Sequence, residues 1–191
     1  MSIVTAVYRN GRITMAADTL AFFGEGMTIP QTNAVASKIM KVGDALIGGT
    51  GWAVYDDILE HWIGDQPPRL DSRTAIYSFF LDFWKALREN YSLVNEQSAT
   101  KETPFGDLDA TFLIASTGGL FQVSSDLGVT QFNSHHAIGS GAEYALGAMH
   151  VLIDTEDDAA RIAQAGCEAA IAMDASCGGS IDVFHVECAE A

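Results

Sequence analysis

The segment SIVTAVYRNGRITMAAD, residues 2–18, contains two apolar runs joined by Asn10-Gly11. The runs cover residues 3–8 and 12–18, and Asn-Gly between such runs is the strongest short signal for a hairpin turn. We therefore predict two antiparallel strands at the start of the chain. Ser2 lies directly before the first strand, so that removal of Met1 would leave its hydroxyl and a free α-amine at the strand end.

These two groups on one residue suggest a particular chemistry. A serine hydroxyl is a weak nucleophile near neutral pH and needs an adjacent base. An α-amine, with a pKa of about 7.7–8.0, is available as such a base. N-terminal nucleophile enzymes use both groups of their first residue in this way. Met-Ser is also a common start for a protein, so the interpretation depends on the rest of the chain.

Hydrophobic patterns and turn residues predict the remaining elements. Residues 20–37 are expected to form a loop, and residues 96–107 an exposed polar loop. One long helix is expected to start at a cap on Asp71 or Ser72 and to carry apolar residues as far as Val94. The other expected helices are residues 53–63, 141–152 and 155–173. The expected strands are residues 3–8, 12–18, 37–42, 44–50, 109–117, 120–125, 128–132, 134–139 and 181–187.

The order of these elements is strands, two helices, strands, two helices and a last strand. Segregated blocks of this kind favour an α+β fold in which sheets are stacked between pairs of helices, rather than alternating βαβ units. With 191 residues, 48% of them hydrophobic, the chain is expected to form one domain over residues 1–191.

Composition excludes several classes of partner. The formal net charge of −15 argues against nucleic acid and against an anionic membrane surface. No run approaches the roughly 18 apolar residues of a membrane-spanning helix, and no secretory signal is visible. Three cysteines without CxxC spacing favour a reducing cytoplasm over a disulfide framework or a zinc site. No metal and no cofactor are expected. His135-His136 has no third ligand at suitable spacing, and Cys167 is expected in the core.

The opening SIVTAVYRNG, followed by Ala16-Ala17-Asp18, resembles the start of proteasome β-type subunits and of HslV, their bacterial relative. HslV also begins with a bare Met before its nucleophile. The resemblance extends in order to residue 187 and implies a four-layer αββα sandwich of the N-terminal nucleophile hydrolase type. It further implies a threonine/serine-type peptidase that hydrolyses polypeptides inside a homo-oligomeric ring, with an unfolding ATPase as partner.

The resemblance also implies the site residues. Ser2 takes the position of the nucleophile, Asp18 that of the aspartate closing the second strand, and Lys38 that of the lysine beside the nucleophile. The segment AIGSG, residues 137–141, places Ser140 in the family's turn before a helix. The segment DASCGG, residues 174–179, places Asp174 and Cys177 where the family supports the nucleophile's amine.

Elementary chemistry makes this set coherent. Lys38 would lower the pKa of the Ser2 hydroxyl, with Asp18 holding Lys38, and the Ser2 amine would take the proton directly or through a water held by Ser140. A backbone N–H of the strand end Gly48-Gly49-Thr50-Gly51 would bind the oxyanion, with Gly49 and Gly51 both open as donor.

Each residue also has a simpler interpretation. Asp18 alone would be a turn or cap residue, Lys38 a solvated charge, Ser140 a helix cap, and Asp174 with Cys177 a structural turn. Two departures from the family pattern are Ser2, where threonine is usual, and Cys177, where serine is usual. The alternatives for function are a non-catalytic ring or scaffold subunit and a small-molecule amidase of the same fold.

Overall fold

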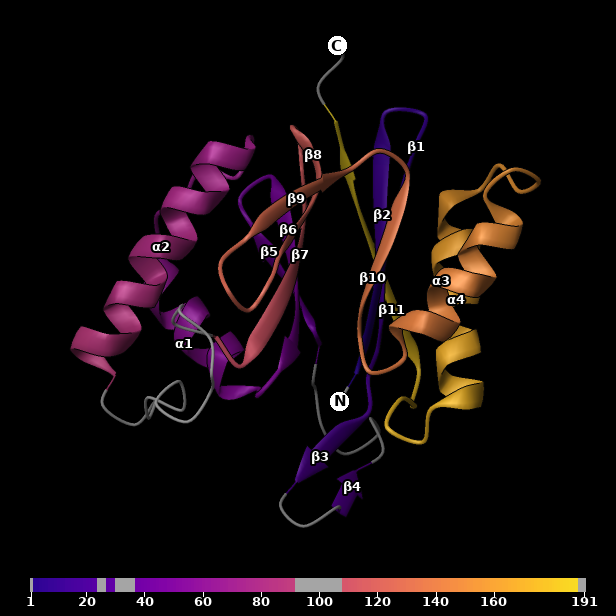
Figure 1. The fold of residues 1–191 in the computed structure, drawn as a ribbon, viewed down its shortest axis with the longest axis horizontal. Coiled ribbons are helices and arrows are strands. Elements are labelled where there is room, and N and C mark those ends of the chain that lie inside the picture. Colours follow the sequence, from indigo (N-terminus) through magenta and orange to yellow (C-terminus); the bar gives the residue numbers. More distant parts are fainter. Residues whose placement is uncertain (1, 24–26, 30–36, 92–107, 189–191) are drawn as a thin grey trace.

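The computed structural model describes residues 2–23, 27–29, 37–91 and 108–188. Two antiparallel sheets face each other between two pairs of helices, giving the four layers predicted for an α+β sandwich (Figure 1). The first sheet has the order β10-β1-β2-β11, formed by His135–Gly139, Ile3–Arg9, Arg12–Asp18 and Ile181–Glu187. The second has the order β5-β6-β7-β8-β9, formed by Ile39–Val42, Ala45–Gly51, Ala110–Ser116, Gly119–Val123 and Val129–Phe132.

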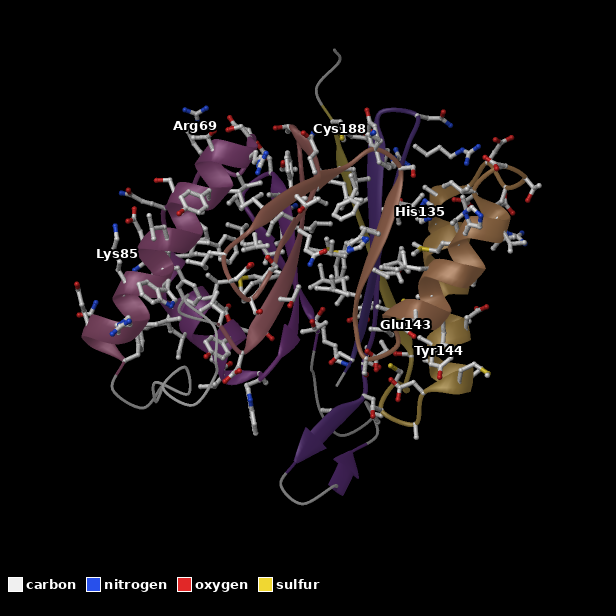
Figure 2. The ribbon with its side chains drawn as sticks, in the orientation of Figure 1. Arg69, Lys85, His135, Glu143, Tyr144 and Cys188 are labelled. Carbon is white, nitrogen blue, oxygen red and sulfur yellow. The ribbon has the colours of Figure 1, made fainter. Side chains whose placement is uncertain are left out.

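Helices cover the outer face of each sheet. Helices α1 (Val54–Ile63) and α2 (Arg73–Asn90) lie beside the five-stranded sheet, and α3 (Ala142–Leu152) and α4 (Ala159–Met173) beside the four-stranded sheet (Figure 1). Lys85 on α2 points away from the sheets (Figure 2), and Glu143 on α3 is also exposed.

Three apolar clusters correspond to the three interfaces between the layers. The cluster between α1, α2 and the five-stranded sheet is the most aromatic, and its Phe80 packs on Phe112 with ring centroids 5.1 Å apart. Val4 and Met15 belong to the cluster between the two sheets. The cluster under α3 and α4 is built from small side chains and includes Cys167, which is fully buried as predicted.

The local turn and cap signals are confirmed. Asn10 and Gly11 both adopt positive φ, as a tight hairpin between β1 and β2 requires. Ser72, rather than Asp71, caps α2 by accepting a hydrogen bond from the Ala75 N–H. Val54, at the start of α1, is 37% exposed, whereas the neighbouring Tyr55 is buried.

The expectation of a loop over residues 20–37 is wrong in part. Two short strands, β3 (Ala21–Phe23) and β4 (Met27–Ile29), pair with each other within this stretch. Strands of three residues are too short for an alternating pattern to be visible in the sequence. Val94 and the predicted loop at residues 96–107 lie outside the described residues.

Strands β9 and β10 follow each other closely but belong to different sheets. Strand β9 pairs with β8, whereas β10 pairs with β1, opposite Ile3 and its neighbours. The chain therefore crosses from one sheet to the other at Asn133-Ser134 and brings the end of β10 beside the beginning of β1. In the part of the chain that the structure describes, no helix has both the length and the apolar character required to span a bilayer.

Phe80 provides a test of the packing of α2. We expect Phe80→Ala to lower the free energy of unfolding by about 3–5 kcal/mol, because it removes a fully buried ring from the most aromatic interface. Tyr77→Ala on the same helix is the matched control, since Tyr77 is 47% exposed, and should change that free energy by no more than about 0.5 kcal/mol. Chemical denaturation of both variants measures the difference, and equal losses would contradict this packing.

Candidate active site

A fully buried carboxylate, that of Asp18, lies at the end of β2. Its Oδ1 accepts from the Ile3 N–H at 3.0 Å and from the Lys38 ammonium at 2.5 Å, and its Oδ2 accepts from the Gly178 N–H at 2.9 Å. A buried charge is tolerated only when it is paired and hydrogen-bonded in this way. Asp18 therefore joins three segments that are remote in the sequence.

Lys38 reaches this carboxylate from the segment that leads into β5. Its side chain is 13% exposed, so the pair it forms with Asp18 is shielded from solvent. A solvated charge at a strand edge, the simpler interpretation of Lys38, does not fit this burial. Ile3, which also bonds Asp18, is the residue that follows Ser2, so the ion pair is held directly beside the candidate nucleophile.

Ser2 is held by the turn after β10. Its backbone N–H donates to the Ser140 Oγ at 3.3 Å, and its carbonyl accepts from the Gly141 N–H at 3.5 Å. The residue is 7% exposed. Gly139 adopts a φ of +109°, and any Cβ there would collide with the Ser2 carbonyl. A glycine is therefore required at this position for the turn to approach Ser2.

The helix-cap interpretation of Ser140 is not supported. Helix α3 takes Gly141 as its N-cap residue and has no side-chain cap bond. The Ser140 hydroxyl instead lies between Ser2 and the segment before β11, with its Oγ 4.0 Å from the Cys177 Sγ. The Ser140 hydroxyl also bonds the Asp174 carboxylate, and this bond makes the largest contribution to lowering the pKa of Asp174. The hydrogen bond from the Ser176 N–H makes the next largest contribution.

Cys177 and Asp174 are in contact with each other. The Cys177 thiol donates to the Asp174 Oδ2 at 3.6 Å, and the Cys177 N–H donates to the Asp174 carbonyl at 2.9 Å. Burial, reinforced by the carboxylates of Asp18 and Asp174, raises the pKa of Cys177 to about 11. The thiol is therefore protonated near neutral pH and acts as a hydrogen-bond donor.

The glycine-rich end of β6 lies beside the turn that holds Ser2. A Cβ at Gly139, which would collide with Ser2, would also lie 3.2 Å from the Thr50 Cγ2. The Gly49 N–H donates to the Lys38 carbonyl at 3.0 Å. Gly51 adopts a φ of +131°, and a side chain there would collide with the Asp109 carbonyl. Contacts thus link Ser2, through Ile3 and Ser140, with Asp18, Lys38, Asp174 and Cys177, and Gly49 joins them through Lys38. Thr50 and Gly51 follow Gly49 at the same strand end.

Asp56, in the first turn of α1, is a neighbour of this site that the sequence did not reveal. Its carboxylate lies against the Cα of Gly49, where a Cβ would collide with the Asp56 Oδ1. Burial, reinforced by the nearby Asp57, raises the pKa of Asp56 to about 6, and Lys38 opposes this shift. In the sequence, the only available signal was an acidic residue five positions after a glycine-rich strand end, which is ordinary for a helix start.

The histidine pair His135-His136 lies at the start of β10. His136 stacks on Phe132 with ring centroids 3.8 Å apart, and its Nε2 lies 2.6 Å from the Gln122 Oε1. Burial is the first cause that lowers the pKa of both His135 and His136. Within the described ranges, no group of three or more histidine, cysteine, aspartate or glutamate side chains is arranged to hold a metal ion.

Comparison with solved structures supports the resemblance noted in the sequence. The BPH protein of Thiobacillus denitrificans is 33% identical, with a TM-score of 0.88, and the match covers 99% of this chain and 100% of that one. The same protein in complex with epoxomicin gives 32% identity and a TM-score of 0.89, covering 98% and 100% of the two chains. No protein-family model and no curated protein sequence matches the chain.

A more distant structure shares the fold. The eukaryotic HslV from Trypanosoma brucei is 21% identical, with a TM-score of 0.70, over 97% of this chain and 99% of that one. The sandwich, the strand order and the likeness over the whole length of the BPH protein agree with one another. The chain belongs to the family of proteasome β-type and HslV-like proteins, with the four-layer sandwich of the N-terminal nucleophile hydrolases.

Proposed function

We propose that this protein is a peptidase in which Ser2 is the nucleophile and its α-amine, freed by removal of Met1, is the general base. The observation that carries the proposal is the convergence on Ser2 of two independent groups of contacts. Asp18 and Lys38 lie beside it through Ile3, and Ser140 bonds its backbone nitrogen. Such a convergence of buried, mutually bonded polar groups is typical of a catalytic site rather than of a scaffold subunit.

The proposed reaction has two stages. In the first, the Ser2 Oγ attacks the carbonyl carbon of a peptide bond and passes its proton to the Ser2 amine. The amine then gives this proton to the leaving nitrogen, which departs as a new N-terminus and leaves an ester on Ser2. In the second, water attacks the ester carbonyl with the amine again as base. The bond from the carbonyl carbon to Oγ breaks, the acyl half leaves as a new C-terminal carboxylic acid, and the amine returns its proton to the Ser2 Oγ. The ammonium of Lys38 favours the negative charge that develops on Oγ.

We assign the oxyanion donor to Gly51. Gly49 was the other candidate, but its N–H already donates to the Lys38 carbonyl. Gly51 is the last glycine of this strand end, and its positive φ turns its backbone away from regular strand geometry. A backbone N–H aimed at the developing oxyanion contributes stabilisation of about 2.7–4 kcal/mol in acyl-transfer enzymes. Thr50, between the two glycines, faces the turn that holds Ser2.

Asp174 and Cys177 position the amine through Ser140 in this proposal. Ser140 bonds the Ser2 nitrogen, and its hydroxyl also bonds Asp174, which in turn accepts from the Cys177 thiol. These bonds fix the orientation of the Ser140 oxygen toward Ser2. Cys177 fills the position of a hydroxyl donor, and its raised pKa keeps the thiol proton in place for that bond.

The remaining parts of the proposal concern assembly and location. We propose a homo-oligomeric ring that encloses the sites and an unfolding ATPase that delivers polypeptides, because the chain belongs to a family whose members work in this way. Three free cysteines, two of them buried, suit a reducing cytoplasm. No cofactor takes part in the proposed reaction.

The central test is the chemistry of the first residue. Intact-mass analysis should show a chain that starts at Ser2, and incubation with epoxomicin, which the Thiobacillus protein binds, should add the mass of the inhibitor. Ser2→Ala should abolish the adduct and the hydrolysis of peptide amides, while the circular dichroism spectrum and the oligomeric state stay as in the parent.

A variant with a blocked N-terminus separates this mechanism from ordinary serine catalysis. When Met1 is retained, the Ser2 nitrogen is an amide without a basic lone pair. A Met1-bearing form that hydrolyses peptides as fast as the processed form would remove the α-amine from its role. If Ser2→Ala kept activity within a few-fold of the parent, the Ser2 hydroxyl would not be the nucleophile.

Lys38 and Asp18 should behave as one unit. Lys38→Ala and Asp18→Asn should each lower kcat by at least about 10²-fold, the scale of a lost acid–base group. The double variant should be little worse than the poorer single variant, because catalytic groups that act together are not additive. Single-turnover kinetics on the folded variants measures this, with Lys41→Ala, an exposed residue of β5, as control. Losses that multiply fully would show that the two residues act separately.

The assembly has its own measurement. We expect sedimentation velocity of the processed protein to give a closed oligomer of many 20.4 kDa chains, since active sites that accept polypeptides must be kept away from folded proteins. The state should persist in Ser2→Ala, whose substitution is small and interior. A stable monomer across protein concentrations and salt conditions would rule out the ring.

A further inference from the structure

Thr19 follows the last residue of β2 and is a buried polar residue that the proposed mechanism does not use. It is 1% exposed, although threonine is mostly found at protein surfaces. Its neighbour in the chain is Asp18, whose carboxylate holds Lys38 beside Ser2. A buried hydroxyl costs free energy unless it forms hydrogen bonds, so the partners of Thr19 indicate what it does.

The backbone N–H and the hydroxyl of Thr19 both bond the segment Gly178-Gly179-Ser180, which leads into β11. The Thr19 N–H donates to the Gly178 carbonyl at 3.2 Å. The Thr19 hydroxyl donates to the Ser180 carbonyl at 3.0 Å, and the Ser180 hydroxyl lies 3.2 Å from the same Thr19 oxygen. Thr19 therefore holds this segment on both sides of Gly179.

The backbone of Gly179 lies directly against the Thr19 hydroxyl. A Cβ on Gly179 would lie 2.5 Å from the Thr19 Oγ1, and Gly179 adopts a φ of +81°. Glycine loses more conformational freedom on folding than any other residue, so two successive glycines need contacts from elsewhere in the fold to keep one conformation. The preceding residue is fixed separately, because the Cys177 N–H donates to the Asp174 carbonyl.

The segment held by Thr19 holds the carboxylate of Asp18 in turn. The Gly178 N–H donates to the Asp18 Oδ2 at 2.9 Å, whereas Oδ1 accepts from the Ile3 N–H and from the Lys38 ammonium. Without the bond from Gly178, one oxygen of a buried charge loses a donor, and the carboxylate is free to rotate. The Lys38 ammonium, which is paired with this carboxylate, would move with it.

Resting on the proposed function, we propose that Thr19 is a positioning residue of the peptidase. Its hydroxyl holds the segment before β11 so that the Gly178 N–H fixes the Asp18 carboxylate and, through it, Lys38. Thr19 contacts neither the substrate nor the reacting atoms in this arrangement. Loss of the hydroxyl should therefore slow the chemical step without weakening the binding of peptide.

The experiment compares Thr19→Val, which keeps the shape of the side chain and removes the hydroxyl, with Thr19→Ser, which keeps the hydroxyl. Single-turnover hydrolysis of a peptide amide by the processed protein gives the rate constant of the chemical step and the dissociation constant of the peptide separately. We expect Thr19→Val to lower the rate constant by about ten- to hundredfold, the rate equivalent of a hydrogen bond to a charged group, with the dissociation constant within about twofold of the parent. Thr19→Ser should keep the rate constant within about threefold.

Thr5 provides the matched control for the loss of a buried hydroxyl. It is fully buried in β1, and its hydroxyl donates to the Ala163 carbonyl of α4 at 2.9 Å rather than to the segment before β11. Thr5→Val should lower the midpoint of denaturant unfolding as Thr19→Val does, but should leave the rate constant within about twofold of the parent. Equal losses of rate in the two variants would reveal a general loss of packing and overturn the inference.

A double variant tests whether Thr19 acts through Asp18. In Asp18→Asn the carboxylate that Thr19 helps to hold is absent, so the addition of Thr19→Val should lower the rate constant by no more than about threefold further. A further loss as large as that seen in the parent background would contradict this route. Thr19→Ala is a second variant without the hydroxyl and takes the place of Thr19→Val in each comparison if the valine variant does not fold.

The outcomes separate this inference from the proposed function. An unchanged rate constant in Thr19→Val, or equal losses in Thr19→Val and Thr19→Ser, would overturn the role of Thr19 and leave the peptidase intact. Failure of the processed parent to cleave any peptide would overturn the proposed function itself.

Discussion

The buried carboxylate of Asp18 is the constraint on which the site depends. A charge without solvent must be satisfied by donors, and the donors here come from the first strand, from the segment before β5 and from the segment before β11. Satisfying Asp18 therefore fixes the position of Ile3, of Lys38 and of Gly178 together. Since Ser2 precedes Ile3 and Cys177 precedes Gly178, both groups around the candidate nucleophile are positioned by this one carboxylate.

The topology supplies the rigidity that such a site needs. Strand β1 lies between β10 and β2, so Ser2 stands at the end of a strand that is bonded on both sides. The crossing of the chain from β9 to β10 brings Gly139, Ser140 and Gly141 to this strand end. Catalytic groups held on paired strands and short turns keep their geometry better than groups on long loops.

Asp56 is an electrostatically unfavourable group at the edge of the site. Asp56 is kept partly buried beside Gly49, and burial raises its pKa toward neutrality. A neutral side chain would be easier to accommodate at that place. Proteins commonly retain such unfavourable groups at functional sites. The Asp18 carboxylate differs from that of Asp56, because hydrogen bonds and an ion pair from the chain itself compensate for its burial.

Local signals in the sequence determined much of the fold. Asn10-Gly11 predicted the first hairpin, because only residues that tolerate positive φ fit that turn, and the apolar periodicity of residues 76–87 predicted the buried face of α2. The position of Ser2 before a strand, with the matches at Asp18 and Lys38, also identified the family. The short strands β3 and β4 escaped detection because three residues carry no measurable period.

Only the tertiary structure decided how the distant parts meet. Ser2 and Ser140 are 138 residues apart in the sequence. The local preferences of these residues do not predict that Ser140 bonds Ser2 instead of capping α3. Sheet pairing likewise decides that the Gly49 N–H donates to the Lys38 carbonyl, and helix packing decides that Asp56 lies over Gly49. Sequence patterns predict the conformation of a single turn, strand or helix, because they reflect interactions between residues close in the sequence. These contacts instead depend on how two sheets and a helix pack against one another.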